Sequence, residues 1–153
     1  IKRRKRNILM VDFKNEITDP LKGRSYTYDL HYHLVWVTKY RERAFSPKIQ
    51  EALKNKLQEI ANDKGYTIQA VEVLENHVHL LISAKPFVSI TVMIKTLKGI
   101  TGKWLWQEYP KEMAKHFWHH HIWSPSYYVG SVGNTNQATI EKYIETQKER
   151  PYK

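Results

Sequence analysis

The order of its periodic segments constrains the fold of this chain more than any other feature. Four segments alternate apolar and polar side chains, as strands do, and they are residues 26–38, 66–74, 75–83 and 126–132. Three segments repeat their apolar residues at helical spacing, and they are residues 46–65, 90–105 and 136–149. The order strand, helix, strand, strand, helix, strand, helix predicts an α+β fold.

The first six segments match the ferredoxin-like split β-α-β arrangement. In that arrangement the first and third strands lie side by side in the middle of an antiparallel sheet. We therefore expect an antiparallel sheet with helices on one face, followed by a separate C-terminal helix. At 153 residues the chain has the length of one domain. We divide it into a basic N-terminal arm, residues 1–23, and a single domain, residues 24–153.

The charge of the chain indicates what kind of partner it binds. The sequence has 25 Lys and Arg against 15 Asp and Glu, which gives a net charge of +10. Such an excess favours a polyanion as partner, although a merely soluble basic surface is the simpler alternative. The absence of cysteine excludes disulfides and thiolate metal sites. No apolar run approaches the ~20 residues of a membrane span, so we expect a cytoplasmic protein without a membrane partner.

Two histidines interrupt the apolar run ENHVHLLIS, residues 75–83. Val78, Leu80 and Ile82 alternate with them and should face the helix-covered core. His77 and His79 then share the other face, which we expect to be open. Strand residues two apart lie about 7 Å from each other, so the two imidazoles can converge on one cation. A third ligand is needed, and an oxygen there would favour Mg²⁺ or Mn²⁺.

Other histidines offer alternative explanations. A His-x-His pair on a strand can simply be two surface imidazoles. His31 and His33 have the same spacing on the neighbouring strand and should face the same way, so His33 is a possible residue near the site. The three consecutive histidines at 119–121 lie in a connection between elements, and we interpret them as a surface feature.

The last predicted helix places a tyrosine and a glutamine on one stripe. Ile140, Tyr143, Ile144 and Gln147 follow the spacing i, i+3, i+4 and i+7, so they face the body of the protein together. Tyr143 and Gln147 are one turn apart. The simpler interpretation is that Tyr143 packs at the edge of the core with its hydroxyl in water.

Several stretches together resemble one known family over roughly residues 24–150. They are YHLVWVTKYR, VEVLENHVHLL, LKG, WSPSYYVGSVGN and YIETQ. On these stretches the chain resembles the single-tyrosine HUH (His-hydrophobic-His) transposases of the smallest bacterial and archaeal insertion sequences, the IS200-like family. The resemblance implies that Tyr143 is the nucleophile, that His77 and His79 bind a metal, and that Gln147 is the third metal ligand.

The resemblance also implies an activity. Such an enzyme cleaves and rejoins single-stranded DNA at hairpin-marked element ends through a 5′-phosphotyrosine intermediate. The implied cofactor is Mg²⁺ or Mn²⁺, and no nucleotide is expected, in agreement with the lack of a GxxxxGK[ST] phosphate loop. The implied assembly is a homodimer whose active sites form in trans, with the histidines of one subunit and the last helix of the other.

Contacts to DNA and rival functions remain open at this point. Six basic residues are candidates for phosphate contacts, namely Lys39, Arg41, Arg43, Lys95, Lys98 and Lys103. The aromatic residues between Trp104 and Tyr128 could stack on unpaired bases, or could pack in the core and at a dimer interface. The rival functions are a noncatalytic ferredoxin-like nucleic-acid-binding module and an HUH replication or conjugation nickase.

Overall fold

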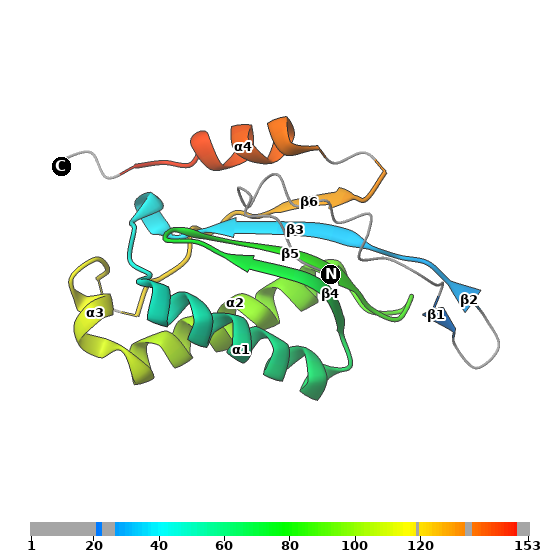
Figure 1. Cartoon of the computed structure of the whole chain (residues 1–153), viewed down its shortest axis with the longest axis horizontal. Helices are drawn as coiled ribbons and strands as arrows, with labels where there is room; N and C mark the ends of the chain where they lie inside the picture. The colour runs from blue at the N-terminus through cyan, green and yellow to red at the C-terminus, as the bar shows by residue number, and fades with distance from the viewer. Residues whose placement is uncertain (1–20, 23–26, 119, 134–135, 150–153) are drawn as a thin grey trace, which may run out of the picture.

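A four-stranded antiparallel sheet forms the centre of the molecule (Figure 1). The computed structural model describes residues 21–22, 27–118, 120–133 and 136–149. The strands are β3 (Tyr32–Val37), β4 (Thr67–Val73), β5 (His77–Ser83) and β6 (Tyr128–Ser131). They are arranged in the order β4-β5-β3-β6. The predicted first and third strands, β3 and β5, are therefore the central pair, which confirms the expected topology.

The strand predicted over residues 26–38 is divided in two. Its first part, β2 (Thr27–Tyr28), pairs with β1 (Leu21–Lys22) in a small separate hairpin. The interruption includes Asp29, whose carboxylate lies 2.7 Å from Nε2 of His31. Aspartate is disfavoured in strands because its side chain bonds locally and competes with the ladder. The N-terminal arm predicted over residues 1–23 lies outside the described residues, except for β1.

Two long helices cover one face of the sheet (Figure 1). Helix α1 (Pro47–Lys64) begins at Ser46, whose Oγ accepts from the backbone N–H of Ile49, and ends at Gly65 with φ 80°. That left-handed conformation favours glycine. Helix α2 (Ile90–Glu108) begins with the same type of cap from Ser89. The short helix α3 (Pro110–Ala114) and a 3₁₀ turn at Lys39–Arg41 were not predicted.

The main core lies between this face and the two helices. It contains the residues that alternate toward the helices on β3 and β5, namely Leu34, Trp36, Val78, Leu80 and Ile82, all fully buried. The residues between them point to the opposite face. Val35, Val37 and Leu81 on that face have no exposed surface either. The sheet is therefore buried on both sides, which explains the nearly continuous apolar sequence of β3 and β5.

Helix α4 (Gln137–Glu145) lies over the second face of the sheet, on the side opposite α1 and α2 (Figure 1). Asn136 begins it, since its Oδ1 accepts from the N–H of Thr139 at 3.0 Å. The helix ends four residues earlier than the predicted Glu149, so Gln147 lies just beyond its last turn. Among the described residues, no helix has both the length and the apolar composition of a membrane span.

Candidate functional site

Three histidines are buried together in the centre of the sheet. Only 7% of His33, 5% of His77 and 2% of His79 is exposed. His33 and His79, on adjacent strands, approach to 3.0 Å between Nδ1 and Nε2. The prediction that these residues share one face is confirmed by the strand register. The prediction that this face is open is wrong, because β5 is buried along its whole length and α4 lies over this side of the sheet (Figure 1).

Burial keeps these imidazoles neutral. It lowers the pKa of His33 and of His77 from 6.5 to about 4. The pKa of His79 falls to about 3, mainly through burial and further through the neighbouring His33 and His77. Desolvation disfavours the charged form of a base, so all three are uncharged at pH 7. A neutral imidazole offers a nitrogen lone pair, which is the form that binds metals.

His77 has the free nitrogen that a metal ligand needs. Its Nδ1 lies 2.8 Å from Oδ1 of Asn76. An amide oxygen only accepts, so Nδ1 carries the proton and Nε2 carries the lone pair. That Nε2 is buried and has no hydrogen-bond partner within the described part of the chain. A buried nitrogen lone pair that has no hydrogen-bond donor is free to coordinate a divalent cation.

The imidazoles alone do not complete a metal site. Within the described ranges, no group of three His, Cys, Asp or Glu residues is arranged to hold a metal ion. A ligand of another type would be required, and the predicted Gln147 has the carbonyl oxygen that Mg²⁺ and Mn²⁺ accept. The residues present therefore fit the implied cation, with His77 as the clearest ligand.

Tyr143 and Gln147 form a second cluster with a serine. The phenol oxygen of Tyr143 lies 2.8 Å from Oγ of Ser126, and that hydroxyl donates to Oε1 of Gln147 at 2.9 Å. Because Ser126 has a single proton, the phenol must donate to it in this arrangement. Nε2 of Gln147 donates to the carbonyl of Tyr143 at 3.0 Å. Burial raises the pKa of Tyr143, and the hydrogen bonding between its oxygen and Ser126 opposes this.

The two clusters lie on the same face of the sheet, the histidines on β5 and β3 and the second cluster next to β6. His79 pairs with Val35, and Val35 pairs with Tyr128 on the other side. The ring of Tyr128 in turn lies 5.9 Å from the ring of Tyr143. Two strand spacings, roughly 9–10 Å, therefore separate the backbone of His79 from that of Tyr128, whose ring is next to the ring of Tyr143. The structure thus brings His33 close to His79, and Tyr143 close to Gln147. Strand β3 lies between His79 and the Tyr143 cluster.

Two of the predicted phosphate contacts have structural roles within the chain. Arg41 donates to the carbonyl of Glu145 at 2.7 Å and pairs with Glu149 at 3.2 Å, so it binds the C-terminal end of α4. Lys98 donates to the carbonyls of Ser124 and Ser126 at 2.7 and 3.1 Å. Burial lowers the pKa of Lys98 to about 8. Both residues fix the elements that carry Tyr143 and Ser126.

The other basic candidates are more accessible. Arg43, Lys95 and Lys103 are exposed, whereas Lys39 is half-buried and lies over the ring of Tyr40. Their contacts with DNA remain predictions. Of the histidine triplet, residues 120 and 121 are exposed and residue 119 lies outside the described residues.

Ser126 and Asn76 were not among the predicted site residues. Ser126 lies in the stretch WSPSYYVGSVGN, and nothing in its spacing shows that a helix 17 residues later contacts it. Asn76 directly precedes His77 in the turn between β4 and β5. A polar residue adjacent to a candidate ligand is the only signal that could have identified it, because the second ring nitrogen of a metal-binding histidine commonly donates to a carboxylate or carbonyl oxygen.

Comparisons with known proteins identify the family of the chain. A family model described as "Transposase IS200 like" matches residues 26–147. The ISDra2 transposase TnpA of Deinococcus radiodurans is 38% identical over 129 residues, which cover 84% of this chain and 91% of that protein. The transposase for insertion sequence element IS200 of Salmonella typhimurium is 30% identical over 118 residues, covering 77% of this chain and 76% of the relative.

Solved structures give the same result. A crystal structure of a transposase candidate from Deinococcus radiodurans R1 superimposes with a TM-score of 0.78 and 37% identity, and the match covers 85% of this chain and 99% of that one. A REP-associated tyrosine transposase bound to a REP hairpin has a TM-score of 0.50 at 14% identity, with 83% and 70% covered, and shows the similarity of the fold. The protein described here belongs to the IS200-like transposase family.

Proposed function

We propose that this transposase cleaves and rejoins single-stranded DNA at hairpin-marked ends, with Tyr143 as the nucleophile. The observation that supports this best is the hydrogen-bonded series Tyr143–Ser126–Gln147, on the same sheet face as His77 and His79. The hairpin as substrate follows from the family resemblance and from the neighbour whose structure contains a REP hairpin.

The proposed reaction exchanges one phosphate ester for another. The phenol oxygen of Tyr143 attacks the phosphorus, and the bond from phosphorus to the 3′-oxygen breaks. The products are a 5′-phosphotyrosine and a 3′-hydroxyl, which takes up one proton while the phenol loses one. Ser126 accepts the hydrogen bond from the phenol and so orients its oxygen. Since one ester replaces another, rejoining by a 3′-hydroxyl needs no ATP.

His77, His79 and Gln147 are the residues that would hold Mg²⁺ or Mn²⁺. A bound divalent cation would supply Lewis-acid stabilisation to the phosphate oxygens. Asn76 fixes the ring of His77 so that Nε2 remains available. His33 contacts Nε2 of His79 at 3.0 Å and so orients the second ring. These supporting bonds are of the kind that determine the tautomer and direction of metal-binding imidazoles.

A covalent-adduct assay tests the nucleophile. Incubation with labelled single-stranded hairpin DNA should give an adduct that survives denaturing electrophoresis, and peptide mapping should locate it on Tyr143. Tyr143→Phe should abolish the adduct while retaining DNA binding. Tyr128→Phe and Tyr127→Phe are matched controls that should keep it. An adduct of full yield in Tyr143→Phe would assign the nucleophile to another residue.

Removal of metal tests the histidine assignment. Excess chelator should abolish adduct formation, and added Mg²⁺ or Mn²⁺ should restore it. His77→Ala and His79→Ala should fail to respond to added metal at concentrations that saturate the unmodified protein. Undiminished cleavage in chelator would contradict the proposed role of the three residues.

We further propose that the active sites assemble in trans within a homodimer, as the resemblance implies. The structure of the single chain holds α4 on its own sheet through Arg41 and Ser126, and the same surfaces on a second copy could receive it. Mixing Tyr143→Phe with His79→Ala subunits tests this, because exchange of α4 would create one intact site per heterodimer. Verified heterodimers that stay inactive, although both variants fold and bind DNA, would contradict assembly in trans.

A further inference from the structure

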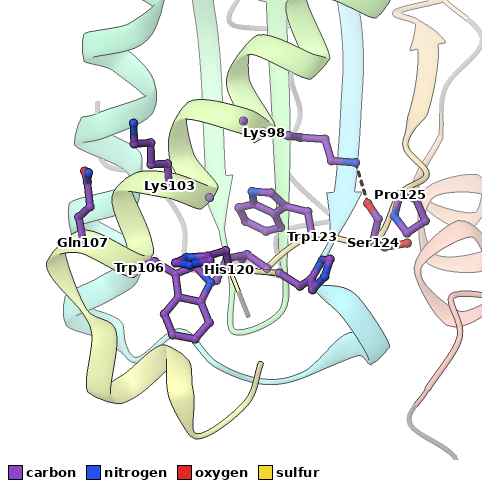
Figure 2. A pocket seen from close by; sticks show the side chains of 12 residues that line it. Lys98, Lys103, Trp106, Gln107, His120, Trp123, Ser124 and Pro125 are labelled. Atoms are coloured by element: carbon purple, nitrogen blue, oxygen red, sulfur yellow. Dashed lines mark hydrogen bonds between the residues drawn. The ribbon is translucent and has the colours of Figure 1, made fainter. Parts of the chain in front are cut away.

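A cavity of about 700 Å³ lies between the second half of α2 and the segment of residues 120–125 (Figure 2). Its size is within the range of small-ligand sites, about 300–1,000 Å³. The residues that line it include Lys98, Gly99, Gly102, Lys103, Trp106 and Trp123. None of its lining residues is acidic. The proposed chemistry at Tyr143 makes no use of this cavity.

Two of the α2 residues that line the cavity are glycines, Gly99 and Gly102. A Cβ added to Gly99 would meet no atom within 4 Å, and one added to Gly102 would meet Trp123 only at an ordinary contact distance of 3.7 Å. Glycine in a helix interior destabilises it relative to alanine. Neither glycine is required by packing within the described residues. Their effect in the structure is to keep the cavity open.

Trp123 lies opposite Gly102, and Lys98 and Lys103 of α2 add cationic side chains to the lining. Trp123 is held in place, since its Nε1 donates to Oγ1 of Thr101 at 3.1 Å and its ring meets Trp36 and Phe45 edge to face. Figure 2 shows its indole beside α2, next to the side chain of Lys98. A fixed, half-exposed indole next to ammonium groups is suited to an unpaired base with its phosphate.

The cavity is adjacent to the Tyr143 cluster. Ser124 lines the cavity, and its Oγ donates to Oε1 of Gln147 at 3.4 Å. Lys98 also lines it and donates to the carbonyl of Ser124 (Figure 2). The same ammonium group donates to the carbonyl of Ser126, the serine that contacts the phenol of Tyr143. A ligand in the cavity would therefore contact residues that bind directly to Gln147 and Ser126, the two partners of Tyr143.

We propose that this cavity binds one unpaired nucleotide of the single-stranded DNA that flanks the cleaved phosphate, with the base against Trp123 and the phosphate near Lys103. The proposal rests on the proposed function, since it assigns a further binding site for the same DNA. It predicts that affinity for unstructured single strands depends on the open space beside Gly99.

Filling the cavity tests the proposal. Gly99→Leu should fill part of the cavity, and the gain in helix propensity should raise the Tm. Its affinity for a labelled oligo-dT strand without hairpins, measured by fluorescence anisotropy, should fall by about fivefold to 100-fold, the range expected when one stacked base is lost. Gly133→Ala is the matched control, because Gly133 also has no atom within 4 Å of an added Cβ and lies outside the cavity.

A second comparison uses the intrinsic tryptophan fluorescence. Thymidine monophosphate should quench it in the unmodified protein but not in Gly99→Leu, while inorganic phosphate at equal concentration should not. Quenching by phosphate alone would overturn the assignment of a base to the cavity. Unchanged oligo-dT affinity in a stably folded Gly99→Leu variant would overturn the proposal as a whole.

The adduct assay separates this proposal from the proposed function. If Gly99→Leu binds oligo-dT as well as the unmodified protein and the unmodified protein still forms the adduct on Tyr143, the cavity proposal alone fails. If no adduct forms but oligo-dT binding still depends on Gly99, the cavity proposal stands as a DNA-binding site and the proposed reaction fails.

Discussion

Mild acid should destabilise the metal-free protein through its buried histidines. In the unfolded chain each imidazole titrates near pH 6.5, whereas in the folded protein His33 and His77 titrate near 4 and His79 near 3. Between these values only the unfolded chain binds the protons. The contribution of the three histidines is therefore fully present above about pH 6.5, is lost as the pH falls, and levels off near pH 3–4.

The expected loss is large compared with the stability of a typical domain. At about 1.36 kcal/mol per pH unit, a pKa lowered from 6.5 to about 4 corresponds to about 3 kcal/mol. Because His33 and His79 share a hydrogen bond, their contributions do not add. His77 contributes about 3 kcal/mol and the coupled pair at least as much, so we expect a total loss of about 6 kcal/mol by pH 4, against a typical stability of about 5–15 kcal/mol.

Urea unfolding in excess chelator between pH 7.5 and pH 4 measures this loss. Carboxylates also titrate near pH 4 and change the stability. The informative quantity is therefore the difference in the pH-dependent loss of unfolding free energy between the unmodified protein and a variant that lacks the imidazoles. The double variant His33→Asn, His79→Gln replaces both rings by amides that can keep a hydrogen bond. Between pH 7.5 and pH 4 its free energy of unfolding should fall by at least about 2 kcal/mol less than that of the unmodified protein. His121→Asn, at an exposed position, is the control. Parallel profiles for the unmodified protein and the double variant would refute the reasoning.

Three further predictions concern the elements around Tyr143. Arg41→Ala should destabilise α4 by about 1–3 kcal/mol through the lost bond to the Glu145 carbonyl, seen as faster amide hydrogen exchange in α4, whereas Arg43→Ala should leave that exchange unchanged. Ser126→Ala should move the alkaline rise of the cleavage rate to higher pH, because the serine hydroxyl, which turns to donate to the phenolate and so lowers the pKa of Tyr143, is removed. Tyr143→Phe should change the free energy of unfolding by only about 0.5–1.5 kcal/mol in urea, since it removes one hydrogen bond.

Much of the fold could be predicted from local patterns. The alternation of side chains assigned both faces of β3 and β5 correctly, and Ser46, Gly65 and Asn136 marked helix boundaries. Helix α3 was missed because its five residues are too few to show a helical period. The turn at Lys39–Arg41 was missed because Tyr40 and Arg41 adopt φ of 58° and 55° without a glycine to signal it.

The site could be predicted less completely. The spacing of His77 and His79 shows that they share a face, but their burial depends on what covers that face. The contact between Ser126 and Tyr143 also depends on the tertiary arrangement, because it forms only where the segment before β6 and helix α4 are adjacent in the folded chain. Arg41 and Lys98 were assigned to phosphate from their charge alone, and the carbonyls they bind come from segments far away in the sequence. Pattern arguments do not specify such long-range partners.

The way α4 is attached determines how readily two copies could exchange it. Ile140 is its only fully buried apolar residue among those described, and Arg41 and Ser126 provide polar contacts. The same contacts would form on a second copy, so exchange by itself changes little contact energy. A short tether holds a segment at an effective concentration in the millimolar range. At micromolar protein this favours the helix on its own chain by about 4 kcal/mol, which other contacts between subunits would have to supply before exchange predominates.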